Sequence, residues 1–70
     1  MVTKQMMKKF LSEMEEYDFN MDTFVFTNDG NNKINARSKF EGVNATVLKD
    51  DPDWKENLRN HINWQIGYKL

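Results

Sequence analysis

The chain has 70 residues, with ten Lys or Arg against eleven Asp or Glu, a formal net charge of −1 and no cysteine. This length predicts a single domain, residues 1–70, near the size at which one apolar core only just offsets the entropy of ordering the chain. The lack of cysteine excludes disulfides and thiol chemistry. The charge balance excludes a strong whole-molecule attraction to nucleic acid. Without an apolar run of signal-peptide or membrane-span length, we expect a cytoplasmic protein with no membrane contact.

The first predicted element is a helix over residues 3–18. Its apolar residues recur at the spacing of one helical face, at Met7, Phe10, Leu11, Met14 and Tyr17. Thr3 is suited to be the N-cap, because its hydroxyl can accept a hydrogen bond from the first helical turn.

Three strands are predicted next, over residues 21–27, 33–40 and 43–48. The segment 28–32 is rich in Asn, Asp and Gly, which favours a hairpin, and Glu41 and Gly42 form a second turn. Alternation in the middle strand predicts that Ile34, Ala36 and Phe40 face inward. The opposite face then carries basic and amide side chains, at Lys33, Asn35, Arg37 and Lys39.

The last predicted helix covers residues 52–66. Asp50-Asp51-Pro52-Asp53 is typical of a helix start, with an Asp cap and Pro at the first helical position, and Gly67 is a suitable C-cap. The element order predicts an α+β fold of the type α-β-β-β-α, a three-stranded antiparallel meander with both helices packed on one face.

This order and length resemble the double-stranded-RNA-binding domain, which implies a similar shape. That family contacts phosphates with a lysine-rich start of its second helix, whereas this chain has Asp50-Asp51-Pro52-Asp53-Trp54-Lys55-Glu56, which would repel phosphate. Small phage-encoded inhibitors of host defence nucleases are also similar in size, acidity and mixed α/β pattern.

Residues for catalysis are few. His61 is the only histidine, and Ser12 and Ser38 lie on a predicted helix surface and in the basic strand, so a nucleophile, base and orienting group are hard to assemble. The acidic run 50–53 lacks the spaced oxygen ligands of a calcium loop, and helix capping explains it. We therefore expect no enzyme activity, no metal, no cofactor and no small-molecule substrate.

Two surfaces are candidate binding sites. Trp64 lies outside the core-facing arc of the last helix, and Trp64, Tyr68, His61 and Arg59 form a candidate protein-binding site, because Trp, Tyr and Arg dominate interface energetics. Alternatively, Trp64 and Tyr68 cover the border of the core. The second candidate is the basic strand face, where Lys33, Arg37 and Lys39 would contact phosphates and Asn35 would read a base edge or sugar.

The combined expectation is a small non-enzymatic protein-binding module, regulatory or inhibitory, of phage or mobile-element type. Its partner would be another protein, or a second copy of the chain in a homodimer. The alternative is a weak nucleic-acid-binding domain that uses the basic outer face of the sheet. A solubilising role for the same basic face is the simplest interpretation of those charges.

Overall fold

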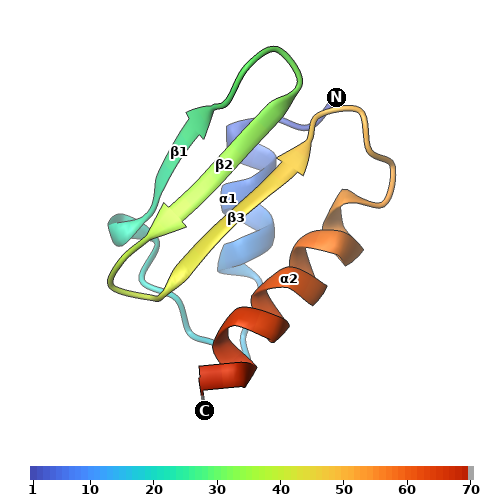
Figure 1. Cartoon of the computed structure of the whole chain (residues 1–70). Helices are drawn as coiled ribbons and strands as arrows, with labels where there is room; N and C mark the ends of the chain where they lie inside the picture. The colour runs from blue at the N-terminus through green and yellow to red at the C-terminus, as the bar shows by residue number, and fades with distance from the viewer. Residues whose placement is uncertain (70) are drawn as a thin grey trace.

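Two helices and a three-stranded antiparallel sheet follow one another in the order α1, β1, β2, β3, α2 (Figure 1). The computed structural model describes the backbone of residues 1–69 and the side chains of residues 1–67. This order confirms the predicted α+β fold class. Within the described chain, no helix combines the length and the apolar character needed to cross a membrane. The elements are α1 (Lys4–Ser12), the short 3₁₀ helix η1 (Met21–Thr23), β1 (Val25–Asn28), β2 (Lys33–Ser38), β3 (Val43–Leu48) and α2 (Trp54–Lys69).

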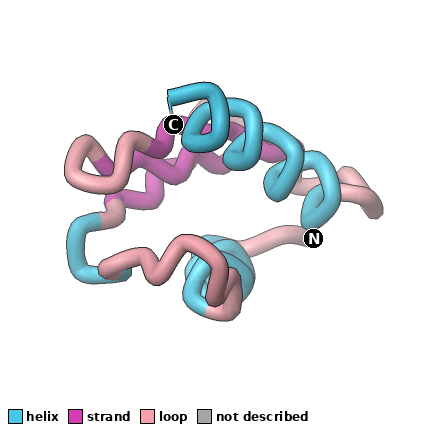
Figure 2. Tube along the Cα trace, turned by 90° about the horizontal axis from the view of Figure 1, so that it is seen from below, coloured by secondary structure: helices cyan, strands magenta, loops and turns pink. Residues whose placement is uncertain are grey.

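One apolar core joins the inner face of the sheet to both helices, as predicted. Figure 2 shows α1 beneath the sheet, while α2 contacts β3. The helices and the sheet bury their side chains together because only one face of each is apolar. The buried apolar residues include Met7, Leu11, Met14, Ile34, Ala36, Val43, Ala45, Val47, Trp54, Leu58 and Ile62.

Helix α1 begins as predicted and ends early. The Thr3 hydroxyl accepts a hydrogen bond from the backbone N–H of Met6 at 3.2 Å, which is the expected N-cap. The helix stops at Ser12, whereas the prediction continued to residue 18. Asp18 has a φ of 49°, a left-handed conformation that a right-handed helix cannot contain. Met14 nevertheless reaches the core from the turns after the helix.

Strand β1 is shorter than predicted because η1 occupies its first residues. The Asn20 side chain accepts from the N–H of Asp22 at 3.1 Å, and the Thr23 hydroxyl donates to the Asn20 carbonyl at 2.7 Å. Such local side-chain bonds offer the backbone an alternative to strand pairing.

The middle strand ends two residues before the predicted end, so the inward placement of Phe40 was wrong. β2 stops at Ser38, and residues 39–42 form a turn in which Gly42 has a φ of 74°. Phe40 is 81% exposed, whereas Ser38 is 2% exposed and fills the last inner position. Lys39 likewise leaves the outer strand face and lies in the turn.

Helix α2 begins at Trp54, two residues after its predicted start, and continues to Lys69, beyond its predicted end. The Asp51 carboxylate accepts from the N–H of Asp53 at 2.9 Å and from the side-chain amide of Asn57 at 2.7 Å, which caps the helix. Gly67 lies inside the helix, so its assignment as the C-cap was wrong. A glycine that ends a helix takes a left-handed conformation with positive φ. Among the described glycines, Gly30 and Gly42 have positive φ values and Gly67 does not.

Candidate protein-binding surface

The outer face of the sheet carries exposed cations beside exposed apolar side chains. Lys33 and Arg37 are exposed on β2, with Val25 59% exposed on β1 and Leu48 44% exposed on β3. Among the described residues, the ion pair present joins Arg59 of α2 to Glu16 after α1, and neither Lys33 nor Arg37 takes part in it. Both cations are therefore free to meet an acidic group on another molecule.

Asn35 lies between these cations, but its amide nitrogen is already used within the sheet. It lies 2.9 Å from Oδ1 of Asn44, 3.0 Å from the hydroxyl of Thr46 and 3.3 Å from the carbonyl of Ala45. These contacts satisfy the two protons that an amide nitrogen can donate. Reading a base edge through this nitrogen would require breaking them.

The structure separates Arg59 from the other candidates on α2. Arg59 forms an ion pair with Glu16, and its guanidinium lies 5.8 Å from the centre of the Phe10 ring. His61 and Trp64 pack edge to face, with ring centroids 6.4 Å apart. The side chain of Tyr68 lies outside the described residues. The described part of the predicted aromatic site is thus His61 with Trp64, while Arg59 contacts the α1 segment.

Gln65 shows how α2 is rotated relative to the sheet. Its side chain bonds to the backbone of Asn44 in β3, so this side of the helix faces the strand. Arg59 and Asn63 bond to Glu16 and Tyr17, on the α1 side of the molecule. At about 100° per residue, residue 61 lies about 160° from both residue 59 and residue 63, whereas residue 64 lies about 160° from the buried residue 62, on the face of the helix turned away from the core.

His61 therefore lies on the flank of α2 turned away from α1, which Figure 2 shows beneath the inner face of the sheet, and its ring packs against Trp64. Trp64 is 67% exposed. The two candidate sites predicted separately from the sequence are thus both turned away from α1. We call this the outer surface, comprising Val25, Lys33, Arg37, Leu48, His61 and Trp64.

The surroundings of Glu16, in the segment after α1, favour its charged form. Hydrogen bonding with its own backbone amide lowers the pKa of Glu16 below the ordinary value of 4.5, and the hydrogen bond and charge of Arg59 lower it further. Both partners remain partly exposed, at 43% for Arg59 and 47% for Glu16. This pair therefore fastens α2 to the segment after α1 with a modest gain in stability.

No metal centre is formed by the described residues, where no three His, Cys, Asp or Glu side chains gather to hold an ion. The surface instead has shallow, open depressions. One of about 420 Å³ adjoins the outer surface at the end of β2, and its lining includes Arg37, Lys39, Asn44 and Gln65.

Phe40 is the exposed aromatic residue that the sequence interpretation missed. A four-residue turn with glycine in the left-handed position is a common hairpin connection, and Lys39-Phe40-Glu41-Gly42 matches it. That pattern, read instead of a two-residue turn at Glu41 and Gly42, would have placed Phe40 at the tip.

Comparison of the chain with family models, with curated proteins and with solved structures finds no match. A functional proposal therefore rests on the geometry and chemistry of the surface.

Proposed function

We propose that this chain is a protein-binding module that acts through the outer surface. The observation that carries the proposal is the exposure of Trp64, at 67%, where it packs against His61 on a part of α2 turned away from α1. Trp and Arg are the residues most enriched among interface hot spots. The regulatory or inhibitory role, the phage or mobile-element origin and the cytoplasmic location are parts of this proposal that rest on the sequence.

The partner is expected to be a protein with an acidic and partly apolar surface. Lys33 and Arg37 supply positive charge that no ion pair among the described residues neutralises, with the apolar Leu48 opposite Lys33 on β3 and Val25 opposite Arg37 on β1. Interfaces of this kind combine an apolar centre with a polar rim that sets orientation and partner choice.

The alternative is weak nucleic-acid binding through Lys33, Arg37 and Lys39, which are all exposed. Three phosphate contacts would give low affinity that falls with salt. Against this alternative, the Asn35 amide nitrogen is bonded within the sheet. We therefore prefer the protein partner.

The experiment that separates these functions uses one set of variants against two kinds of ligand. The protein recovered with the wild-type chain from source cells is purified, and its affinity is measured for the wild type, Trp64→Ala and Arg37→Glu. Lys8→Glu, an exposed charge reversal on α1, is the matched control. The same variants are titrated with short DNA and RNA duplexes at low and moderate salt.

Protein binding is supported if Trp64→Ala and Arg37→Glu each weaken the protein complex about tenfold or more while Lys8→Glu does not. Nucleic-acid binding is supported if Arg37→Glu abolishes a duplex complex that salt also weakens, with no effect of Trp64→Ala. Sedimentation of the chain alone tests the homodimer, which would show a mass that rises with concentration and falls in Trp64→Ala.

A further inference from the structure

Four hydrogen bonds form a ring through the turn between β2 and β3 and the η1 segment, and two of them cross between these two parts. The backbone N–H of Glu41 donates to the Ser38 hydroxyl at 3.2 Å, and the Ser38 and Thr23 hydroxyls lie 2.8 Å apart. The Thr23 hydroxyl donates to the Asn20 carbonyl at 2.7 Å. The backbone N–H of Asn20 donates to the Glu41 carboxylate at 3.0 Å, which closes the ring.

The number of protons that each hydroxyl can donate determines which group donates in each of these hydrogen bonds. A hydroxyl donates one proton, and that of Thr23 goes to the Asn20 carbonyl. Ser38 must therefore donate to Thr23 while accepting from Glu41. The four bonds form a closed circuit around Ser38, which is 2% exposed. We call residues 38–42 the hairpin tip.

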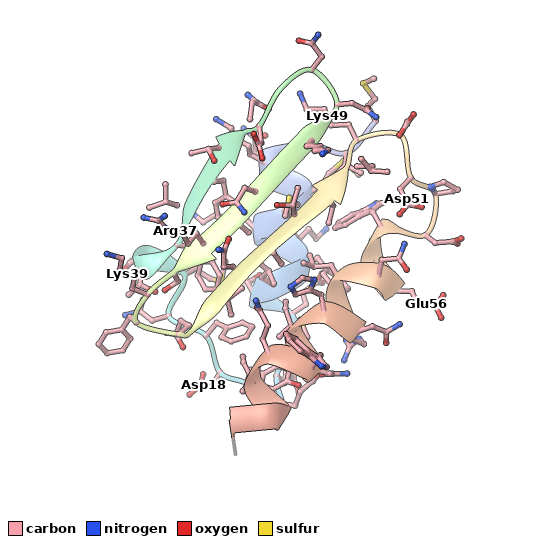
Figure 3. The ribbon with its side chains drawn as sticks, in the orientation of Figure 1. Asp18, Arg37, Lys39, Lys49, Asp51 and Glu56 are labelled. Atoms are coloured by element: carbon pink, nitrogen blue, oxygen red, sulfur yellow. The ribbon has the colours of Figure 1, made fainter. Side chains whose placement is uncertain are left out.

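This circuit determines what the hairpin tip presents to solvent. Ser38 and Glu41 are both held toward η1, and Phe40 between them is 81% exposed. Figure 3 shows Arg37 and Lys39 at this end of the sheet, at the opposite end from Lys49 and Asp51. A rigid loop loses little conformational entropy on association, so an apolar side chain that it presents is an efficient anchor.

The charge around Phe40 is positive. Arg37 and Lys39 line the depression of about 420 Å³ next to the hairpin tip. The Glu41 carboxylate is turned away to the backbone of Asn20. A carboxylate entering this depression would meet two cations with no competing ion pair among the described residues.

We propose that Phe40 is the apolar anchor of the protein interaction, inserting into an apolar pocket whose rim carries an Asp or Glu that binds between Arg37 and Lys39. This inference rests on the proposed protein-binding function, and it adds Phe40 and Lys39, which lie outside the outer surface, while Arg37 belongs to both. The hairpin tip is the part that enters the partner, and the outer surface extends the contact.

The test replaces Phe40 with the photocrosslinking residue p-benzoylphenylalanine in source cells, with the same residue at position 8 on α1 as the control. The crosslinked peptide is sequenced, and the captured protein is purified for affinity measurements. We expect one protein, crosslinked within an apolar segment that adjoins Asp or Glu. Phe40→Ala should weaken its binding about tenfold or more, and Phe40→Leu by about threefold or less, with the melting temperature unchanged.

The proposal is overturned if position 40 gives no product above the position 8 control, if it crosslinks to nucleic acid or a second copy, or if Phe40→Ala binds like the wild type. Trp64→Ala separates the two proposals. Loss of binding in Trp64→Ala alone would retain the outer surface and reject the anchor. Loss of binding in Phe40→Ala alone would retain the anchor and reject the outer surface.

Discussion

The side-chain amide of Gln65 pairs with the backbone of Asn44 as a neighbouring strand would. The N–H of Asn44 donates to Oε1 of Gln65 at 3.1 Å, and Nε2 of Gln65 donates to the Asn44 carbonyl at 2.9 Å. One amide thus satisfies both polar groups of a residue at the edge of the sheet. Exposed strand edges are templates for pairing with other chains, so Gln65 protects β3 at this point. The same contact, with the buried Trp54, Leu58 and Ile62, fixes which side of α2 faces the sheet and the core, and Trp64 remains exposed.

Gln65→Ala removes both hydrogen bonds. We expect the free energy of unfolding to fall by about 1 kcal/mol, since water can reach Asn44 and replace part of the loss. Urea unfolding followed by tryptophan fluorescence measures this change. Gln5→Ala, an exposed glutamine on α1, is the matched control and should stay within about 0.5 kcal/mol of the wild type. Equal effects of the two variants would show that the Gln65 contact adds nothing to stability.

Ser38→Ala opens the hydrogen-bonded circuit of the hairpin tip. The loss should be about 1–3 kcal/mol, because the hydroxyl is buried and has two partners. The Glu41 amide should also exchange its hydrogen faster, since it loses its acceptor. Ser12→Ala, whose hydroxyl is exposed and donates to Lys9 on the same helix, is the control. A protected Glu41 amide in Ser38→Ala would mean that the turn is rigid without the circuit.

Glu16→Gln changes how stability depends on pH. The folded-state pKa of Glu16 is lowered by its backbone hydrogen bond and by Arg59, so the unfolded chain binds its proton first as pH falls. Its contribution is present above the ordinary value of 4.5 and is lost as pH falls through the folded value. Urea unfolding of the wild type should therefore lose stability below about pH 4.5 relative to Glu16→Gln. Glu15→Gln is the control, and an identical acid profile for both variants would contradict the assignment.

Trp64→Ala should separate binding from folding. Trp64 is 67% exposed, so its removal should change the free energy of unfolding by less than about 1 kcal/mol. The partner complex should nevertheless weaken about tenfold or more. Circular dichroism melting and calorimetric titration of the same samples provide both values. A large loss of stability would indicate that Trp64 covers the core, as the alternative interpretation of the sequence holds.

Much of the fold is predictable because its patterns are local. Alternation predicts β3 with its observed bounds and with Val43, Ala45 and Val47 inward, all of them buried. The caps at Thr3 and Asp51 follow from the side-chain oxygens that helix starts require.

Parts that depend on tertiary contacts are less accessible to sequence analysis. Phe40 continues the alternation of β2 in the sequence, but the strand ends where Ser38 bonds across to Thr23. Arg59 lies near Trp64 in the sequence, yet its ion-pair partner Glu16 is 43 positions away in the chain. The side of α2 that faces β3 also depends on a contact distant in sequence, between Gln65 and the backbone of Asn44.

The central claim is that a protein partner binds at the hairpin tip and the outer surface. It is tested most directly by a residue-resolved NMR map of the ¹⁵N-labelled chain with its purified protein partner. We expect the largest shift changes at the hairpin tip and over the outer surface, including Arg37, Leu48 and Trp64, with little change at Lys8 on α1. Changes concentrated on the exposed face of α1 would contradict the claim. So would an unchanged spectrum with the protein but salt-sensitive changes at Lys33, Arg37 and Lys39 with a DNA or RNA duplex.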